Sequence, residues 1–151
     1  MKTGIYINIM QIKFLLTGAY CLDNFSPHSI VYNGQKYPTA EHLYQALKFD
    51  NPKIVAEIID ANSPLQAKII ASKYKQQRIN NWSETKVQTM KKVLNLKLYQ
   101  HPEIQDYLKS TNESELIENN PEDDFWGIGD GNGQNMIGKI WMEIKSKNFN
   151  F

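Results

Sequence analysis

The sequence is poor in cysteine. It contains only Cys21, so it cannot form an internal disulfide bond, and a buried thiol is favoured over a nucleophile. Its few histidines and its cysteine do not group at the spacing of zinc ligands. These absences predict a cytoplasmic protein in a reducing compartment that needs no metal and no redox cofactor.

Long hydrophobic runs are also lacking. No segment approaches the roughly 20 apolar residues that span a bilayer, so no membrane partner is expected. The apolar segment 5–16 is interrupted by Asn8, Gln11 and Lys13, and no small-residue cleavage site follows it. A secretory signal peptide is therefore not expected either.

A global excess of charge is the third absence. The net charge of +1 excludes a protein that binds nucleic acid through an overall excess of positive charge alone. Locally, residues 68–97 contain eight basic residues against the acid Glu84, and residues 103–124 contain eight acids against Lys109. The two stretches are either solvated faces that attract one another, or the basic one guides a phosphorylated substrate.

The chain length of 151 residues and its 41% hydrophobic content predict one domain over residues 1–151. Ile5, Ile7 and Ile9 alternate as in a strand, and Asn33-Gly34 is typical of a hairpin turn. Apolar periodicity, caps and prolines predict helices over about 40–49, from Pro52, from Pro64, over 83–99, from Pro102 and over 136–145. We therefore expect a mainly α, compact single-domain fold with a small N-terminal β element.

Glu41, Gln45 and Lys48 follow one another at helical spacing, so their side chains project from one face of the first predicted helix. This face would combine a carboxylate with an amine. The spacing alone leaves two interpretations open. The pair is either catalytic, or its charges only complement the two ends of the helix dipole.

A glycine-rich segment at residues 124–135 precedes the last predicted helix, and four of the eight glycines lie within 127–133. Such a loop can present backbone amides to a phosphate, although it matches no standard nucleotide fingerprint and the glycines could simply build a turn. Trp126 beside this loop is well placed to stack on a base or a sugar.

The residues described so far resemble the NADAR family, also called YbiA-like, over about residues 12–145. The motifs that carry the resemblance stand in the family's order: Asn24-Phe25-Ser26-Pro27, residues 34–37, Glu41-His42, Gln45, Lys48-Phe49, Ser63-Pro64, Ala67-Lys68, Arg78, Trp82, Lys86, Phe125-Trp126-Gly127, Asn135 and Gly138-Lys139. One departure is Ala71-Ser72, where the family often has Gly-Arg, so a contact to phosphate made by that arginine would be missing.

The resemblance implies a mostly helical fold and N-glycosidase activity on ribosides, with substrates that range from ribosylamine phosphates of the riboflavin pathway to ADP-ribose attached to guanine bases. The expected partner is a small phosphoribosyl or ADP-ribosyl substrate, or ADP-ribose attached to nucleic acid. Glu41, Lys48 and Asp124 match the family's catalytic pocket positions. The substrate-binding positions that it implies are Asn24, Phe25, Ser26, Gln45, Arg78, Trp82, Trp126, Gly127, Gly129 and Asn135. The alternatives are a module that binds ADP-ribose or an NAD-like ligand without turnover, and a protein that binds a nucleic acid or partner through residues 68–97.

Overall fold

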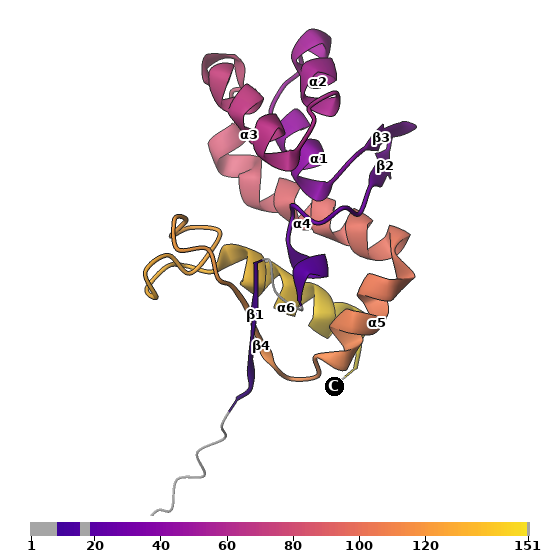
Figure 1. Ribbon diagram of the computed structural model, residues 1–151, viewed down its shortest axis with the longest axis vertical. Coiled ribbons are helices and arrows are strands. Elements are labelled where there is room, and N and C mark those ends of the chain that lie inside the picture. The colour runs from indigo at the N-terminus through magenta and orange to yellow at the C-terminus, as the bar shows by residue number, and fades with distance from the viewer. Residues whose placement is uncertain (1–8, 16–18, 151) are drawn as a thin grey trace, which may run out of the picture. The chain divides into compact units, whose positions relative to one another are not determined.

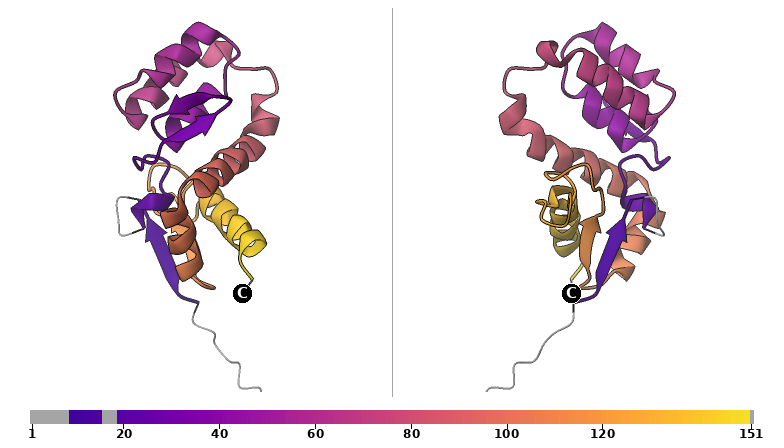
Figure 2. Two further views of the ribbon diagram at one scale, coloured as in Figure 1. Left: turned by 90° about the vertical axis from the view of Figure 1, so that its right-hand side faces the viewer. Right: turned by 60° about the vertical axis from the view of Figure 1, so that its left-hand side comes forward.

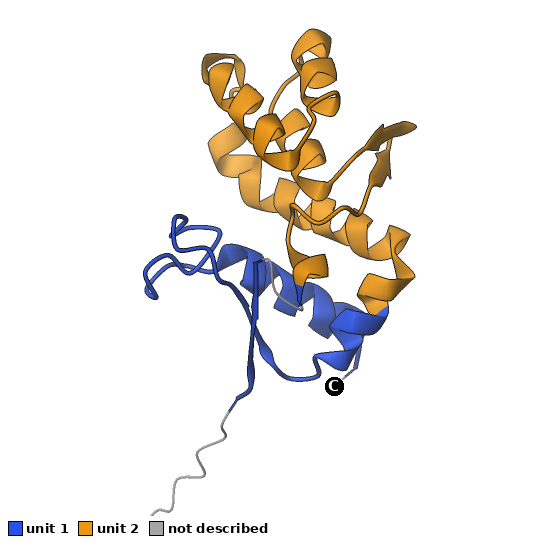
Figure 3. Cartoon of the chain, viewed as in Figure 1, with its two compact units in different colours: residues 1–19, 106–151 blue, residues 20–105 orange. Residues whose placement is uncertain are grey.

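The computed structural model describes residues 9–15 and 19–150, which divide into two compact units. Residues 20–105 form one unit, here called the helical unit, and the described residues of 1–19 and 106–151 form the other, here called the strand unit (Figure 3). Ile5 and Ile7, part of the predicted N-terminal strand, lie outside the described residues, and strand β1 covers Gln11–Phe14.

The helical unit begins with a short 3-10 turn, Tyr20–Leu22, and the predicted hairpin, which is confirmed. Strand β2 (Ile30–Tyr32) pairs antiparallel with β3 (Gln35–Tyr37), and Ile30 lies opposite Tyr37. Asn33 and Gly34 connect the strands with φ of 51° and 77°. Both residues thus adopt the left-handed conformation that a tight two-residue hairpin turn requires.

Helices α1 (Ala40–Ala46), α2 (Pro52–Ile59) and α3 (Pro64–Lys73) pack against one another, and α1 also packs on the long helix α4 (Trp82–Gln100) (Figure 1). A 3-10 turn, Lys75–Gln77, precedes α4. The first three helices begin where local side chains cap them. Thr39, Asn51 and Ser63 accept hydrogen bonds from the amides of His42, Lys53 and Gln66. Helix α4 begins at Trp82, one residue before the start predicted at residue 83.

In the strand unit, β1 pairs with β4 (Glu115–Glu118), and helix α6 (Met136–Asn148) packs on β4 (Figure 2). The two strands run parallel, with Gln11 opposite Glu115. Gly138 allows the close approach of α6, because a Cβ there would lie 2.1 Å from the Leu116 carbonyl oxygen. Helix α5 (Pro102–Ser110) contains the boundary between the units, at Asp106.

The prediction of a mainly α fold with only a small N-terminal β element is wrong. The chain is mixed α/β, because a strand late in the sequence forms a second sheet with β1. The local sequence pattern does not predict β4, for a physical reason. Only Leu116 and Ile117 are apolar there, they lie between two glutamates, and the partner strand is about a hundred residues away. Strand formation at this point depends on tertiary pairing rather than on local pattern.

Candidate active site

Helix α1 contains Glu41 and Gln45, two of the three polar residues expected to share one face, and it is buried along its entire length. Glu41 is 7% exposed, and Lys48, two residues beyond the helix end, is 8% exposed. Gln45 Nε2 donates a hydrogen bond to Glu41 Oε1 at 2.6 Å. A buried carboxylate on a helix in contact with three other helices is costly unless it has partners, so the contacts of Glu41 decide its chemistry.

Burial raises the pKa of Glu41 above its ordinary value, because removal of water disfavours the carboxylate. Four groups oppose this shift: the hydrogen bond from Gln45, the positive charges of Lys68 and Lys48, and a hydrogen bond from the Asn24 side chain. The carboxyl group therefore holds its proton more readily than an exposed glutamate and still has groups that stabilise its ionised form. A general acid and base needs both properties.

The amine of Lys48 lies against two aromatic rings. Its Nζ is 5.0 Å from the ring centroid of Tyr44 and 5.4 Å from that of Trp82. Burial, with the nearby charge of Arg78, lowers the pKa of Lys48 to about 8, while Glu41 acts in the opposite direction. At pH 7 about one amine in ten is then neutral, which is the form that can attack carbon.

Three further basic side chains act on this pair from separate elements. Lys68 lies on α3, Arg78 precedes α4, and Lys86 lies on α4, and all three contribute to the lowered pKa of Lys48. Arg78 Nε is buried and has no hydrogen-bond partner among the described residues. An unpaired buried guanidinium N–H is expensive, and an anion would satisfy it.

The loop before β2 brings Asn24 to the start of α1. The Asn24 carbonyl oxygen accepts the Glu41 amide at 3.1 Å, and Asn24 Nδ2 lies 3.3 Å from Met90 Sδ. Asn24 Oδ1 and Gln45 Oε1 are buried, and neither finds a donor within the part of the chain that the structure describes. The site thus contains two carbonyl acceptors that the hydroxyl groups of a sugar could satisfy.

Of the other residues predicted in this loop, Ser26 is fully buried and its hydroxyl accepts a hydrogen bond from Lys97 Nζ at 2.7 Å. Phe25 is partly buried, and its amide donates to Asp23 Oδ1 at 2.7 Å. The helical unit thus brings Asn24, Glu41, Gln45, Lys48 and Trp82 together with Arg78. It uses the Ser26 side chain to hold its own loop.

Tyr44 was not among the residues predicted from sequence, yet its ring packs against that of Trp82, with centroids 5.3 Å apart. The signal was available, because Tyr44 precedes Lys48 by four residues and must lie on nearly the same side of the helix.

The remaining predicted residues belong to the strand unit and lie in the loop 119–135 before α6. Asp123 Oδ1 accepts the amides of Phe125 and Trp126, Gly129 N donates to Asn120 O at 3.0 Å, and Gly133 N donates to Ile128 O at 2.7 Å. The first amides of α6 donate to the carbonyl groups of Phe125 and Trp126. The amides of Gly129, Gly131 and Gly133 and the first two amides of α6 are therefore occupied by carbonyl groups of the loop itself.

Asn135 also makes structural contacts. Its side chain accepts the Glu118 amide and donates to the Leu116 carbonyl group, each at 2.9 Å, and so ties α6 to β4. Trp126 is partly exposed, with its ring edge-on to Phe125, and Asp124 is exposed. Gly127 and Gly129 are buried in the same loop, and Gly129 has a left-handed φ of 56°.

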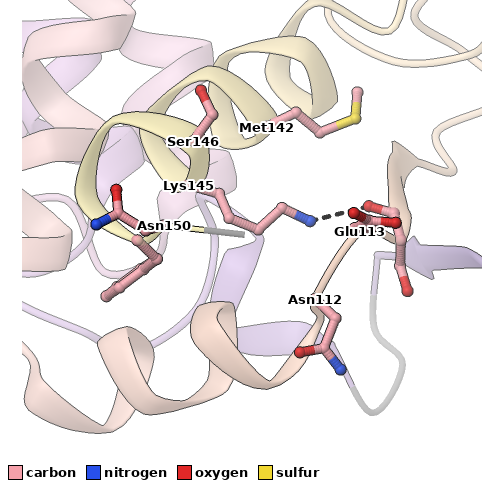
Figure 4. Close-up of a pocket in the computed structure, with 8 residues that line it drawn as sticks. Asn112, Glu113, Met142, Lys145, Ser146 and Asn150 are labelled. Carbon is pink, nitrogen blue, oxygen red and sulfur yellow. Dashed lines mark hydrogen bonds between the residues drawn. The ribbon is translucent and has the colours of Figure 1, made fainter.

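The strand unit also contains a cavity of about 390 Å³ beside the end of α6 (Figure 4). Lys145 lines it, and its Nζ donates to Thr111 Oγ1 at 3.2 Å and to Ser114 O at 2.9 Å. These two bonds hold the turn between α5 and β4 in place. Among the described residues, no group of three or more acidic, histidine or cysteine side chains could hold a metal ion, and no described helix is long and apolar enough to cross a membrane.

Comparison with known proteins identifies the family. The model of the NADAR domain matches residues 13–147, which include residues of both units. The chain belongs to the NADAR family. It is 34% identical over 125 residues to N-glycosidase YbiA of Escherichia coli (strain K12), a match that covers 82% of the chain and 78% of that protein. The NMR structure of E. coli YbiA matches with a TM-score of 0.83 and 32% identity, over 92% of this chain and 84% of that one.

A second kind of NADAR relative is larger. The chain is 34% identical over 127 residues to a riboflavin biosynthesis protein of Vibrio vulnificus (strain YJ016), covering 83% of the chain but only 35% of that protein. A chloroplastic riboflavin biosynthesis protein of Zea mays is 39% identical over 140 residues, which are 22% of its length. The chain thus spans about a third or less of these two relatives and most of YbiA.

Proposed function

We propose that this NADAR protein is an N-glycosidase that hydrolyses the bond between a phosphorylated ribose, or ADP-ribose, and a nitrogen base. The observation that carries the proposal is the buried pair of Glu41 and Lys48, set among Lys68, Arg78 and Lys86. The name of the relative N-glycosidase YbiA supports the same chemistry, and the riboflavin biosynthesis proteins point to an intermediate of that synthesis as one candidate substrate.

In the proposed reaction, Glu41 acts first as a general acid. The C1′–N bond breaks, its electron pair leaves with the base, and the base takes the proton from the carboxyl group. The resulting carboxylate stabilises the positive charge that develops on the sugar, and then removes a proton from the water that attacks C1′. The products are a free base and a ribose with a hydroxyl group at C1′, and Glu41 regains its proton.

Lys48 supports a second, covalent route. The neutral amine attacks C1′, the base leaves with a proton, and opening of the sugar ring gives an iminium that water hydrolyses to release both the sugar and the amine. The pKa of about 8 favours this route, because part of the amine is neutral near pH 7. Glu41 would serve as the proton donor to the base in either case.

We assign the phosphate to the basic groups of the helical unit rather than to the glycine loop. Arg78 offers a buried N–H without a partner among the described residues, while the amides of Gly129, Gly131 and Gly133 are bonded within the loop. The ribose hydroxyl groups would donate to Asn24 Oδ1 and Gln45 Oε1. Asp124 and Trp126 belong to the strand unit, and their roles as a catalytic and a stacking residue stay predictions from the resemblance to the family.

The substrate is tested with a panel of ADP-ribosylated guanosine, a ribosylamine pyrimidine phosphate and NAD, with the released base separated by chromatography. We expect release from at least one of the first two compounds. If all three bind by calorimetry and none loses its base, the chain is a binding module for such ligands and the glycosidase proposal is wrong.

A further inference from the structure

A second lysine of the helical unit, Lys97 on α4, has a fully buried side chain, with 0% exposure. Its Nζ donates to the Asp23 carbonyl oxygen at 2.8 Å and to Ser26 Oγ at 2.7 Å. Ser26 Oγ in turn lies 2.8 Å from His28 Nδ1. One amine therefore attaches the loop before β2 to the long helix at two points.

Asn24 lies between these two points of attachment. Its carbonyl oxygen accepts the Glu41 amide at 3.1 Å, and its side-chain amide, which lies 3.3 Å from Met90 Sδ, acts to lower the pKa of Glu41. A continuous series of contacts thus leads from Lys97, through Asp23 and Ser26, to Asn24 and Glu41. Residues on three different parts of the chain meet in it: α4, the loop and α1.

Burial of the Lys97 amine is energetically unfavourable, and the need to fill space in the core does not explain why a lysine is present at this position. Removal of the amine from water lowers its pKa to about 7, although the nearby Cys21 and Asp23 act to raise it. A methionine would fill nearly the same space without that cost, but it could not donate to the loop. The hydrogen bonds to the loop are what the lysine supplies.

We propose that Lys97 is a positioning residue, which holds the loop 23–26 on α4 so that Asn24 stays in contact with Glu41. The inference rests on the proposed function only where activity is measured, because the contact between Asn24 and Glu41 exists without a substrate. Its consequence is specific. If Lys97 is lost, Asn24 withdraws, and Glu41 loses one of the groups that favour its ionised form.

Glu41 and Lys97 have different charged neighbours. Glu41 is influenced by Lys48 beyond α1 and by Lys68 from α3. Lys97 is influenced by Cys21 and Asp23. The next charged groups beyond the loop are His28, His101 and Glu103, where Glu103 Oε1 lies 3.2 Å from His101 Nδ1. Removal of Lys97 therefore takes away a charge that is separate from those acting directly on Glu41.

The test is a carbon-13 NMR titration of the Glu41 carboxyl carbon in the full chain without ligand, with the signal assigned by its loss in Glu41→Gln. Lys97→Met should raise the Glu41 pKa by about 0.5 or more, since a hydrogen bond to a carboxylate is worth on the order of one pKa unit. Asn24→Ala should raise it similarly, and the double variant should add little to either change. An unchanged or lower pKa in Lys97→Met would overturn the proposal.

Lys145→Met is the matched control. Lys145 is also a buried lysine that bonds a backbone carbonyl group and a hydroxyl group, but it belongs to the strand unit. Lys145→Met should leave the Glu41 pKa unchanged. If the Glu41 pKa rises as much in Lys145→Met as in Lys97→Met, the rise is a general effect of destabilisation and the proposal is overturned. If Lys97→Met does not fold, Ser26→Ala decides the question. It removes one of the two attachments and should raise the Glu41 pKa by less, and no rise would contradict the positioning role.

Activity provides the second readout. In Lys97→Met the acid limb of the pH profile of kcat/KM should move to higher pH together with the Glu41 pKa measured by NMR. The fold-change in kcat should be larger than the fold-change in KM. If the NMR shift is found but no riboside is cleaved by the unmodified chain, the glycosidase proposal fails while the positioning role stands. If the riboside is cleaved and the NMR value does not move, the positioning role alone fails.

Discussion

Glu41 is the residue in which stability and chemistry oppose each other. Its pKa in the folded protein is raised above the unfolded value by burial. Above about pH 4, where the unfolded chain ionises, the folded protein must first keep its proton and, at still higher pH, bury a carboxylate, so the free energy of unfolding is lower than it would be with a neutral group. This loss of stability is present at neutral pH and disappears as the pH falls below about 4.

Glu41→Gln should for this reason be at least as stable as the unmodified protein at pH 7. The glutamine keeps an oxygen for the Gln45 amide and removes the buried charge. Denaturant unfolding of both proteins at pH 7 and at pH 4 measures the difference, which should be larger at pH 7. A clear loss of stability at pH 7 would mean that the attraction between Glu41 and Lys48 outweighs the cost of burial.

Lys48 titrates in an accessible range, so the direction in which kcat changes with pH tests the covalent route. If the amine attacks C1′, kcat should increase as the pH rises through about 8, because the neutral form is then populated. Borohydride added during turnover should leave a sugar adduct on Lys48 that mass spectrometry detects. An active Lys48→Arg variant, together with no adduct, would exclude the covalent route.

Local sequence patterns were sufficient to predict the helix starts and the hairpin turn, because a few neighbouring residues determine each of them. Asn51-Pro52 and Ser63-Pro64 start α2 and α3 as predicted, and Asn33-Gly34 forms the hairpin turn. Strand β4 was missed because its stability comes from pairing with β1. The spacing of Glu41 and Gln45 could be predicted, whereas the burial of Lys97 and the bonding of the glycine-loop amides depend on contacts across the fold.

The glycine loop and the basic groups give opposite predictions for phosphate binding. Gly129→Val should destabilise the protein by about 1–3 kcal/mol, because φ is 56° and Asp124 Cβ is 3.1 Å from the added Cβ. It should reduce the affinity for phosphorylated and unphosphorylated ribosides equally. Arg78→Gln should weaken only the phosphorylated ligand, by about tenfold or more, because a charged hydrogen bond is lost.

Calorimetric titration of each variant with both ligands makes the comparison, and circular dichroism checks the fold. If the glycine variant loses affinity for the phosphorylated ligand alone while remaining folded, the phosphate binds at the loop after all.

For the whole molecule, the buried Lys97 makes the stability depend on pH. Its folded pKa of about 7 lies below the unfolded value of roughly 10.4. Below pH 7 the folded protein bears the full cost of protonating the amine. Between about pH 7 and pH 10 that cost declines, so the group's contribution to the free energy of unfolding rises with pH by up to about 1.4 kcal/mol per unit.

Comparison with Lys97→Met isolates this contribution, because the other titrating groups are common to both proteins. The unmodified protein should gain stability relative to the variant as the pH rises from 7 to 9, in urea unfolding at constant ionic strength. A difference that does not change over this interval would show that Lys97 titrates normally in the folded protein.

We propose that Glu41 is the essential group of a glycosidase site in the helical unit. The most direct measurement is the rate of base release from the cleaved riboside by the unmodified protein and by Glu41→Gln, with the affinity of each for the ligand measured in parallel. We predict release that is at least about 10² times slower in the variant, with affinity changed by no more than a few-fold. Equal rates in the two proteins would contradict the claim.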